Sequence, residues 1–124
     1  MSENLQDLQD YIQYQFEDFK SFKLALFLNS GEVLVKFAVG DVEKDFIDNL
    51  ISNIQTQNSG SFHLENREFS LQTPSGNLLE FENSESEKIF ALKNGENLMI
   101  VYCSGSTVDK DQERIKELIM DLFN

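Results

Sequence analysis

Apolar residues recur with a helical period in three segments of the chain. The first segment predicts a helix over roughly residues 3–19, with apolar positions three or four residues apart. The second predicts a helix over 41–55, for which Asp41 can serve as the N-cap. The third runs from Ile115 to Phe123 and follows a Ser-Thr-Val-Asp stretch that has the form of a capping box. These patterns predict an early helix, a middle helix and a late helix.

The sequence between the helices has the alternating or continuously apolar character of β-strands. Two β-rich runs flank an Asn-Ser-Gly-Glu turn and predict a hairpin, and an Asn-Gly turn after residue 93 predicts a second hairpin. The nearly continuous apolar run 98–103 predicts a central strand that is covered on both faces. We therefore expect one domain over residues 1–124 with an α+β fold. Its central antiparallel sheet would have about five to six strands in the order α-β-β-α-β-β-β-α, with helices on both faces.

The middle helix carries more apolar surface than one contact needs. At about 100° per residue its apolar side chains span roughly 180° of the helix circumference, whereas a helix on a single core usually shows a stripe of about 100°. We therefore expect two contacts. One contact would be with the chain's own sheet and the other with something else; the apolar residues are Val42, Phe46, Ile47, Leu50, Ile51 and Ile54. If the following β-rich segment folds over this helix, the apolar excess becomes internal and the reason for an outside contact disappears.

Composition and charge narrow the class of partner. The chain has 124 residues and a formal net charge of −12, so a nucleic acid backbone or an anionic membrane would be repelled. We therefore expect no nucleic acid binding. We also expect no membrane insertion, because no apolar run reaches the ~20 residues of a membrane helix. A single cysteine excludes an intrachain disulfide, and with no apolar signal core at the start of the sequence this favours a cytoplasmic protein.

No residue set has the pattern of a catalytic or metal site. Cys103 and His63 would have to meet for nucleophilic catalysis, and each is expected within a strand as a packing residue. One histidine and one cysteine do not supply a zinc site. The acidic clusters near 41–45 and 109–113 fit the first turns of helices, where negative charge complements the helix dipole. A Gly-Ser-Thr stretch before the last helix could bind an anion, but it fits a strand-to-helix connection better. We expect no enzyme activity, cofactor or metal.

Three stretches carry a resemblance to a known family. Residues 24–35, Leu-Ala-Leu-Phe-Leu-Asn-Ser-Gly-Glu-Val-Leu-Val, are similar to the first hairpin of the roadblock/dynein light-chain family, whose relatives are the longin and profilin-like folds. Residues 41–55 occupy the position of that family's middle helix, and 98–103 precede the last helix as its final strand does. Residues 62–73 depart from the family by about one additional strand pair.

The resemblance implies a non-enzymatic adaptor that dimerises and serves as a platform or regulator for a small Ras-like GTPase. The dimer would be a homodimer or a heterodimer of paralogues. By position, the interface would contain Ile47, Ile51 and Ile54 on the paired helix and Leu79 and Phe81 on the joining strand. Two alternatives stay open: an acidic chaperone of the secretion type that binds an unfolded client segment, and a small-ligand sensor on a profilin-like fold.

Overall fold

The computed structural model describes residues 2–40, 42–55, 61–64, 67–72 and 78–121. Within these residues, three helices and seven strands follow one another in the order α-β-β-α-β-β-β-β-β-α. The helices are α1 (Ser2–Phe16), α2 (Lys44–Gln55) and α3 (Val108–Asp121). The strands are β1 (Phe22–Asn29), β2 (Glu32–Ala38), β3 (Ser61–Leu64), β4 (Arg67–Leu71), β5 (Leu78–Glu82), β6 (Glu87–Asn94) and β7 (Asn97–Ser104).

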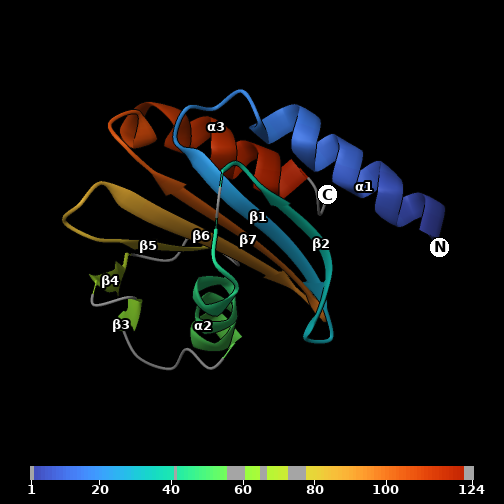
Figure 1. Cartoon of the computed structure of the whole chain (residues 1–124), viewed down its shortest axis with the longest axis horizontal. Coiled ribbons are helices and arrows are strands. Elements are labelled where there is room, and N and C mark those ends of the chain that lie inside the picture. Colours follow the sequence, from blue (N-terminus) through green and yellow to red (C-terminus); the bar gives the residue numbers. More distant parts are fainter. Residues whose placement is uncertain (1, 41, 56–60, 65–66, 73–77, 122–124) are drawn as a thin grey trace.

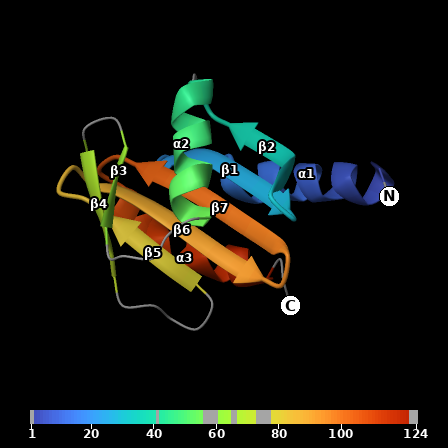
Figure 2. The same ribbon diagram turned by 90° about the horizontal axis from the view of Figure 1, so that it is seen from below.

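All seven strands form one antiparallel sheet in the order β2-β1-β7-β6-β5-β4-β3. Helices α1 and α3 lie on one face of this sheet, and α2 crosses the other face (Figures 1 and 2). The α+β class, the single antiparallel sheet and the helices on both faces confirm the prediction. The strand count was wrong, because five strands follow α2 instead of three. The segment after α2 forms the additional hairpin β3–β4, which extends one end of the sheet.

The sheet separates two hydrophobic cores. The core under α1 and α3 includes Phe16 and Ile119, and the core under α2 includes Leu50 and Phe81. Strand β7 contributes alternate side chains to both, so every residue from Leu98 to Cys103 is buried. This confirms the prediction of a central strand covered on both faces, and it follows from the continuous apolar sequence of the strand.

The apolar excess of α2 is taken up inside the chain. Strands β3 and β4 lie beside α2 beyond β5 (Figure 2), and α2 contacts β3 directly. Their aromatic residues Phe62 and Phe69 join the same core as Ile47 and Ile54 of the helix. The helix therefore packs against two walls of one curved sheet. The width of its stripe reflects this second wall, which the sequence analysis assigned to a second protomer.

Local signals placed most turns correctly and misplaced some helix ends. Both expected hairpins are present, and the glycine of the Asn-Gly turn, Gly95, has a φ of +64°. The first helix ends at Phe16, three residues before the predicted end, because the chain turns there and Phe19 packs beside Phe16 in the core. The second helix begins at Lys44, and its predicted N-cap, Asp41, lies outside the described residues.

Candidate protein-binding surface

Strands β3 and β4 bury only the face that carries their apolar side chains, which point toward α2. Strand β5 follows the same pattern except at Leu78, which joins the core under α1 and α3. On the opposite side of the sheet α1 contacts β2, and α3 contacts β6 and β7 and reaches β5 through the Lys116–Glu80 ion pair. The opposite side chains are polar and are directly paired across the strands, as His63 is with Glu68 and Ser70 is with Glu82. We call this the outer sheet face. Its polar residues are His63, Glu68, Ser70, Gln72, Glu80 and Glu82.

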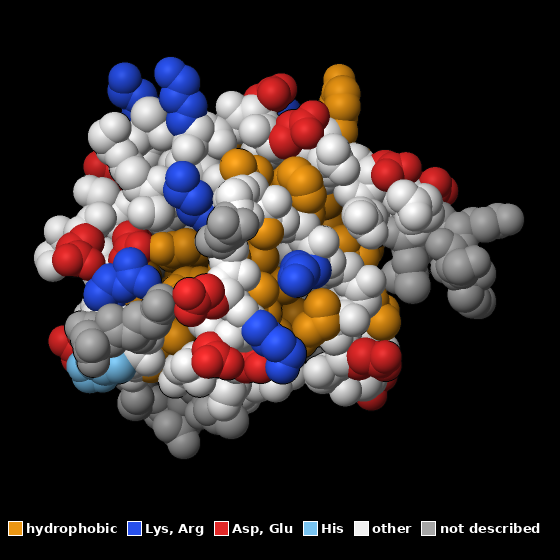
Figure 3. All heavy atoms as spheres, viewed as in Figure 1, with side chains coloured by type: hydrophobic (Ala, Val, Ile, Leu, Met, Phe, Trp, Pro, Cys, Tyr) orange, Lys and Arg blue, Asp and Glu red, His pale blue; other side chains and the backbone are white. Residues whose placement is uncertain are grey.

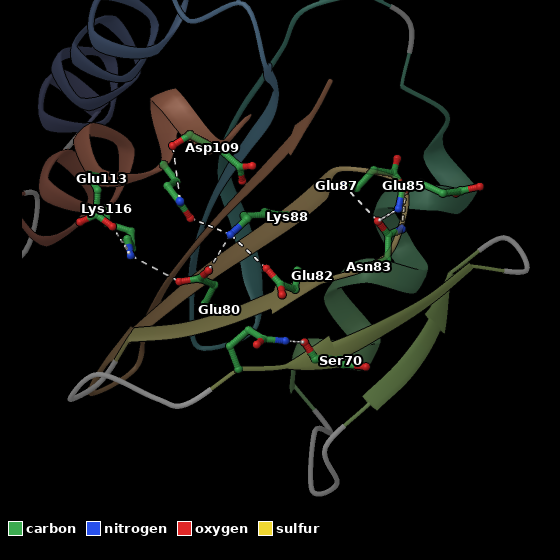
Figure 4. A network of polar contacts seen from close by, with 12 residues as sticks. Ser70, Glu80, Glu82, Asn83, Glu85, Glu87, Lys88, Asp109, Glu113 and Lys116 are labelled. Carbon is green, nitrogen blue, oxygen red and sulfur yellow. Dashed lines mark hydrogen bonds and ion pairs between the residues drawn. The ribbon is translucent and has the colours of Figure 1, made fainter. Parts of the chain in front are cut away.

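A row of alternating charges links the outer sheet face to α3 (Figure 4). The Lys88 ammonium on β6 lies 3.1 Å from a carboxylate oxygen of Glu80 and 3.0 Å from one of Glu82. Lys116 on α3 lies 3.4 Å from the other Glu80 oxygen and 3.0 Å from Glu113. Each lysine therefore holds two carboxylates in place. Side chains that are fixed before binding lose less conformational entropy when a partner docks.

The raised pKa of Lys88 shows that this row is not simply a set of solvated surface charges. Burial by itself would lower the pKa of Lys88, but the hydrogen bonds and negative charges of Glu82 and Glu80 outweigh burial and raise it. Lys88 also donates a 2.6 Å hydrogen bond to the side-chain oxygen of Gln112 on α3. This lysine is therefore a charged, well-anchored junction between β5, β6 and the last helix.

The turn between β5 and β6 is held by a buried carboxylate. Glu87 is only 3% exposed, and it accepts hydrogen bonds from Arg67 at 2.5 Å, Asn83 at 2.7 Å and the Tyr102 hydroxyl. The side-chain oxygen of Asn83 in turn accepts the backbone N–H groups of Glu85 and Glu87. Burial and the hydrogen bond to Glu87 raise the pKa of Tyr102. Three separate strands, β4, β6 and β7, are thus tied together at this turn.

A hollow of about 560 Å³ opens between this turn and β4. It is lined by three glutamates, one arginine and four neutral polar residues: Glu68, Glu82, Glu85, Arg67, Ser70, Gln72, Asn83 and Ser84. The Arg67 charge is already matched by Glu87, so the hollow is acidic on balance. An acidic hollow on a rigid sheet favours a basic group of a protein partner over an anionic ligand.

The five predicted interface residues are brought together, but inside the protomer. Ile54 and Phe81 are fully buried, Ile47 is 6% exposed, and Ile51 and Leu79 are partly buried against the same core. Strand β5, the predicted joining strand, pairs with β4 on one edge and β6 on the other. The end strands of the sheet are β2 and β3. The dimer interface stays a prediction, and its strongest sequence argument now has an explanation within the chain.

Sequence reasoning missed the outer sheet face, although a signal for it was present. Apolar and acidic residues alternate strictly in Leu79-Glu80-Phe81-Glu82, and the predicted interface used only the apolar ones. The polar half marks an exposed face. What the pattern did not contain is the pairing of these glutamates with Lys88 and Lys116, which depends on sheet register and on where α3 docks.

The structure also separates the residues weighed for catalysis. His63 is exposed on the end strand β3, whereas Cys103 is fully buried in the core under α1 and α3. Burial raises the pKa of Cys103 to about 12, so the thiol is protonated at neutral pH. Within the described ranges, no group of three or more His, Cys, Asp or Glu side chains could hold a metal ion.

The stretch before α3 serves as a helix cap. The backbone N–H groups of Lys110 and Asp111 donate to the Thr107 carbonyl oxygen, and the Thr107 hydroxyl lies 3.2 Å from the Asp111 carboxylate. The same carboxylate accepts a 2.7 Å hydrogen bond from the Ser21 hydroxyl before β1. The cap therefore uses Thr107 and Asp111 in place of the predicted pair Ser106 and Asp109, and it also anchors the helix to the rest of the fold.

Comparison with known proteins rests on structure alone. No protein-family model matches the sequence, and no curated protein sequence matches it significantly. LokiProfilin1, in its complex with rabbit actin, matches 98% of this chain with 96% of its own at a TM-score of 0.65 and 10% identity. Profilin from Schizosaccharomyces pombe matches 92% of this chain with 94% of its own at 0.63 and 14% identity. The chain has a profilin-like fold. The roadblock family of the sequence resemblance is not shown by these comparisons.

A third profilin also matches nearly the whole chain. Acanthamoeba castellanii profilin IB matches 94% of this chain with 98% of its own at a TM-score of 0.56 and 12% identity. Among the described residues, no helix is long and apolar enough to span a membrane.

Proposed function

We propose that this chain is a non-enzymatic protein-binding regulator of the profilin type, and that actin or an actin-like protein is its partner. The observation that carries the proposal is the match of almost the whole chain to LokiProfilin1, a protein whose structure was solved in complex with rabbit actin. A second such protein, LokiProfilin2 in complex with rabbit actin, matches 91% of this chain at a TM-score of 0.60 and 11% identity.

The outer sheet face is the surface we assign to this binding. It is polar, and its glutamates Glu80 and Glu82 are held by Lys88 of β6, while Lys116 of α3 also holds Glu80. The acidic hollow beside it would receive a basic side chain of the partner. Charge complementarity of this kind raises the association rate and selects the orientation of docking. Binding would therefore be surface recognition by a rigid sheet.

The test is titration of monomeric rabbit actin with the full chain, followed by calorimetry and by the rate of actin polymerisation. We expect a 1:1 complex. The double variant Glu68→Lys, Glu85→Lys reverses two charges that line the hollow. It should weaken binding by about tenfold or more, which corresponds to about 1.4 kcal/mol. Both side chains are exposed, so the variant should melt like the unmodified chain.

The matched control is Glu32→Lys, Glu96→Lys, which makes the same charge change at the opposite ends of the strands. Glu32 follows the β1–β2 turn and Glu96 lies in the β6–β7 turn, and both are exposed. This control should bind actin as the unmodified chain does. The proposal fails if no complex forms at about 100 μM actin, an affinity weaker than roughly −5.5 kcal/mol. Equal weakening by both pairs would refute the assignment to the outer sheet face.

The dimeric platform for a small GTPase stays a prediction of the sequence resemblance. The profilin-like fold is a relative of that family's fold, so the general role of a protein-binding module is common to both. The side chains that motivated dimerisation, Ile47, Ile51 and Ile54, pack within the chain. We therefore place the actin-type partner first.

A further inference from the structure

A second cleft lies on the α2 side of the sheet, away from the outer sheet face. Its volume is about 360 Å³, within the usual range for small-ligand sites. Residues from five elements or their connections meet there: Lys23 of β1, Val39 after β2, Val42, Glu43 and Phe46 at the start of α2, Arg67 of β4, and Tyr102 and Ser104 of β7. Arg67 also lines the acidic hollow of the actin-type function proposed above, and the other seven residues do not.

An irregularity in β1 places a lysine in this cleft. Phe22 pairs with Cys103 and Leu24 with the adjacent Tyr102, so Lys23 is an extra residue in the ladder between β1 and β7. Phe22 consequently joins the core under α1 and α3, while Leu24 joins the core under α2. Bulges of this kind redirect side chains and are frequent beside functional sites. Among the described residues, the Lys23 ammonium has no ion-pair partner.

The rest of the cleft is divided into a polar wall and an apolar wall. Arg67 and Tyr102 are held in place by Glu87, so the polar wall is fixed, and Ser104 adds a hydroxyl beside them. The opposite wall consists of Val39, which is 42% exposed, Val42 and Phe46. The Phe46 ring contacts the Tyr102 ring at 5.0 Å between centroids and closes the floor.

Among the described residues that line the cleft, Lys23 is the positive charge without an ion pair. Glu87 compensates Arg67, and exposed Glu43 is not within ion-pair distance of Lys23. A ligand that satisfies both walls needs an anionic head for Lys23 and an apolar body for the valines and Phe46. We propose that this cleft binds a carboxylate carried by a small apolar group, with Lys23 as its charge partner.

The test is a two-dimensional NMR titration of the full chain with 4-phenylbutyrate, and with its neutral amide as the matched probe. We expect saturable shifts at the backbone amides of Val39, Phe46 and Ser104. The amide should bind about tenfold more weakly or worse, because it loses a charge-assisted hydrogen bond. Lys23→Gln should weaken phenylbutyrate by the same factor, and Lys23→Arg should retain most of the affinity.

Lys36→Gln is the control for a general loss of positive charge, since Lys36 is an exposed lysine on β2. It should leave binding unchanged. A further arm uses acetyl-Gly-Phe with a free carboxylate: tighter binding than phenylbutyrate assigns the carboxylate to a peptide terminus, and weaker binding assigns it to a small organic acid. The proposal is overturned if phenylbutyrate gives no saturable shifts at these amides, or if Lys23→Gln binds it as well as the unmodified chain does.

Discussion

Strands β7 and β5 lie two places apart in one sheet and meet different surroundings. Every residue of β7 from Leu98 to Cys103 is buried between two layers of helices. In β5 Phe81 is fully buried under α2, while Glu80 and Glu82 lie on the opposite face and are partly exposed. The same backbone ladder thus supports a strand that stabilises the core and a strand that presents charges. Stability and recognition are assigned to neighbouring parts of one sheet.

Loss of the buried aromatic on β5 should have the largest effect. Phe81 is fully buried, and its ring meets Phe62 edge-on at 5.0 Å. We expect Phe81→Ala to lower the free energy of unfolding by about 3–5 kcal/mol, as other buried Phe→Ala changes do. Urea denaturation measures this, and the partly exposed Val33→Ala is the control, with a change below about 0.5 kcal/mol. A small effect of Phe81→Ala would mean that β3–β5 contribute little to the core.

Removal of the buried negative charge on β6 should have the next largest effect. Glu87→Gln keeps the shape of the side chain but removes its ion pair with Arg67. We expect a loss of about 2 kcal/mol, less than for a fully buried pair because Arg67 is 29% exposed. Thermal melting of Glu87→Gln, Arg67→Gln and the double variant gives the coupling energy. Strictly additive losses would show that this ion pair does not hold the turn.

Raised pH should destabilise the central strand before the outer face. The pKa of Cys103 rises from 9.0 to about 12, and the pKa of Tyr102 also rises above its usual 10.0. Above pH 9 the unfolded chain loses these protons first, so stability is full below that pH and falls as pH rises. The loss should be on the order of 1 kcal/mol by about pH 10. Cys103→Ala should reduce this loss of stability at high pH. If the substitution leaves the dependence of stability on pH unchanged, the titration of Cys103 does not cause the loss.

The last substitution, for which we expect no change in molar mass, tests whether α2 faces only its own chain. Ile51 is partly buried, so we expect Ile51→Asp to cost roughly 1–2 kcal/mol of stability without changing the molar mass in solution. Light scattering after size-exclusion chromatography at tens of micromolar measures the mass. A dimer that Ile51→Asp dissociates would restore the interface predicted from the sequence.

The buried strand β7 could be predicted from the sequence, and the charged outer face at β5 could not. Continuous apolar residues allow only one interpretation of β7, and Asn-Gly sets its hairpin with β6. The stripe on α2 predicted one contact with the chain's own sheet and one with something else. Its second wall, however, comes from Phe62 and Phe69 in short strands. A helical pattern gives the width of the apolar face and does not identify what covers it.

The candidate surface was hidden for a similar reason. Glu80 and Glu82 meet Lys88 because of the β5–β6 register, and Glu80 meets Lys116 because α3 docks against β6. No spacing of residues in the sequence predicts either contact. The bulge that turns Lys23 is likewise a property of the pairing between β1 and β7. Features that depend on register become visible only when the sheet is assembled.

The pairing of β1 with β7 also governs how the chain must fold. Ala25 pairs with Val101, and this contact closes a loop that contains α2 and the other five strands. Such distant pairing makes folding slow, because the loop must close before its contacts stabilise anything. Until β7 has been synthesised, β2 protects only one edge of β1, which is rich in Phe and Leu. The unpaired edge of β1 is where a newly made chain is most exposed to aggregation.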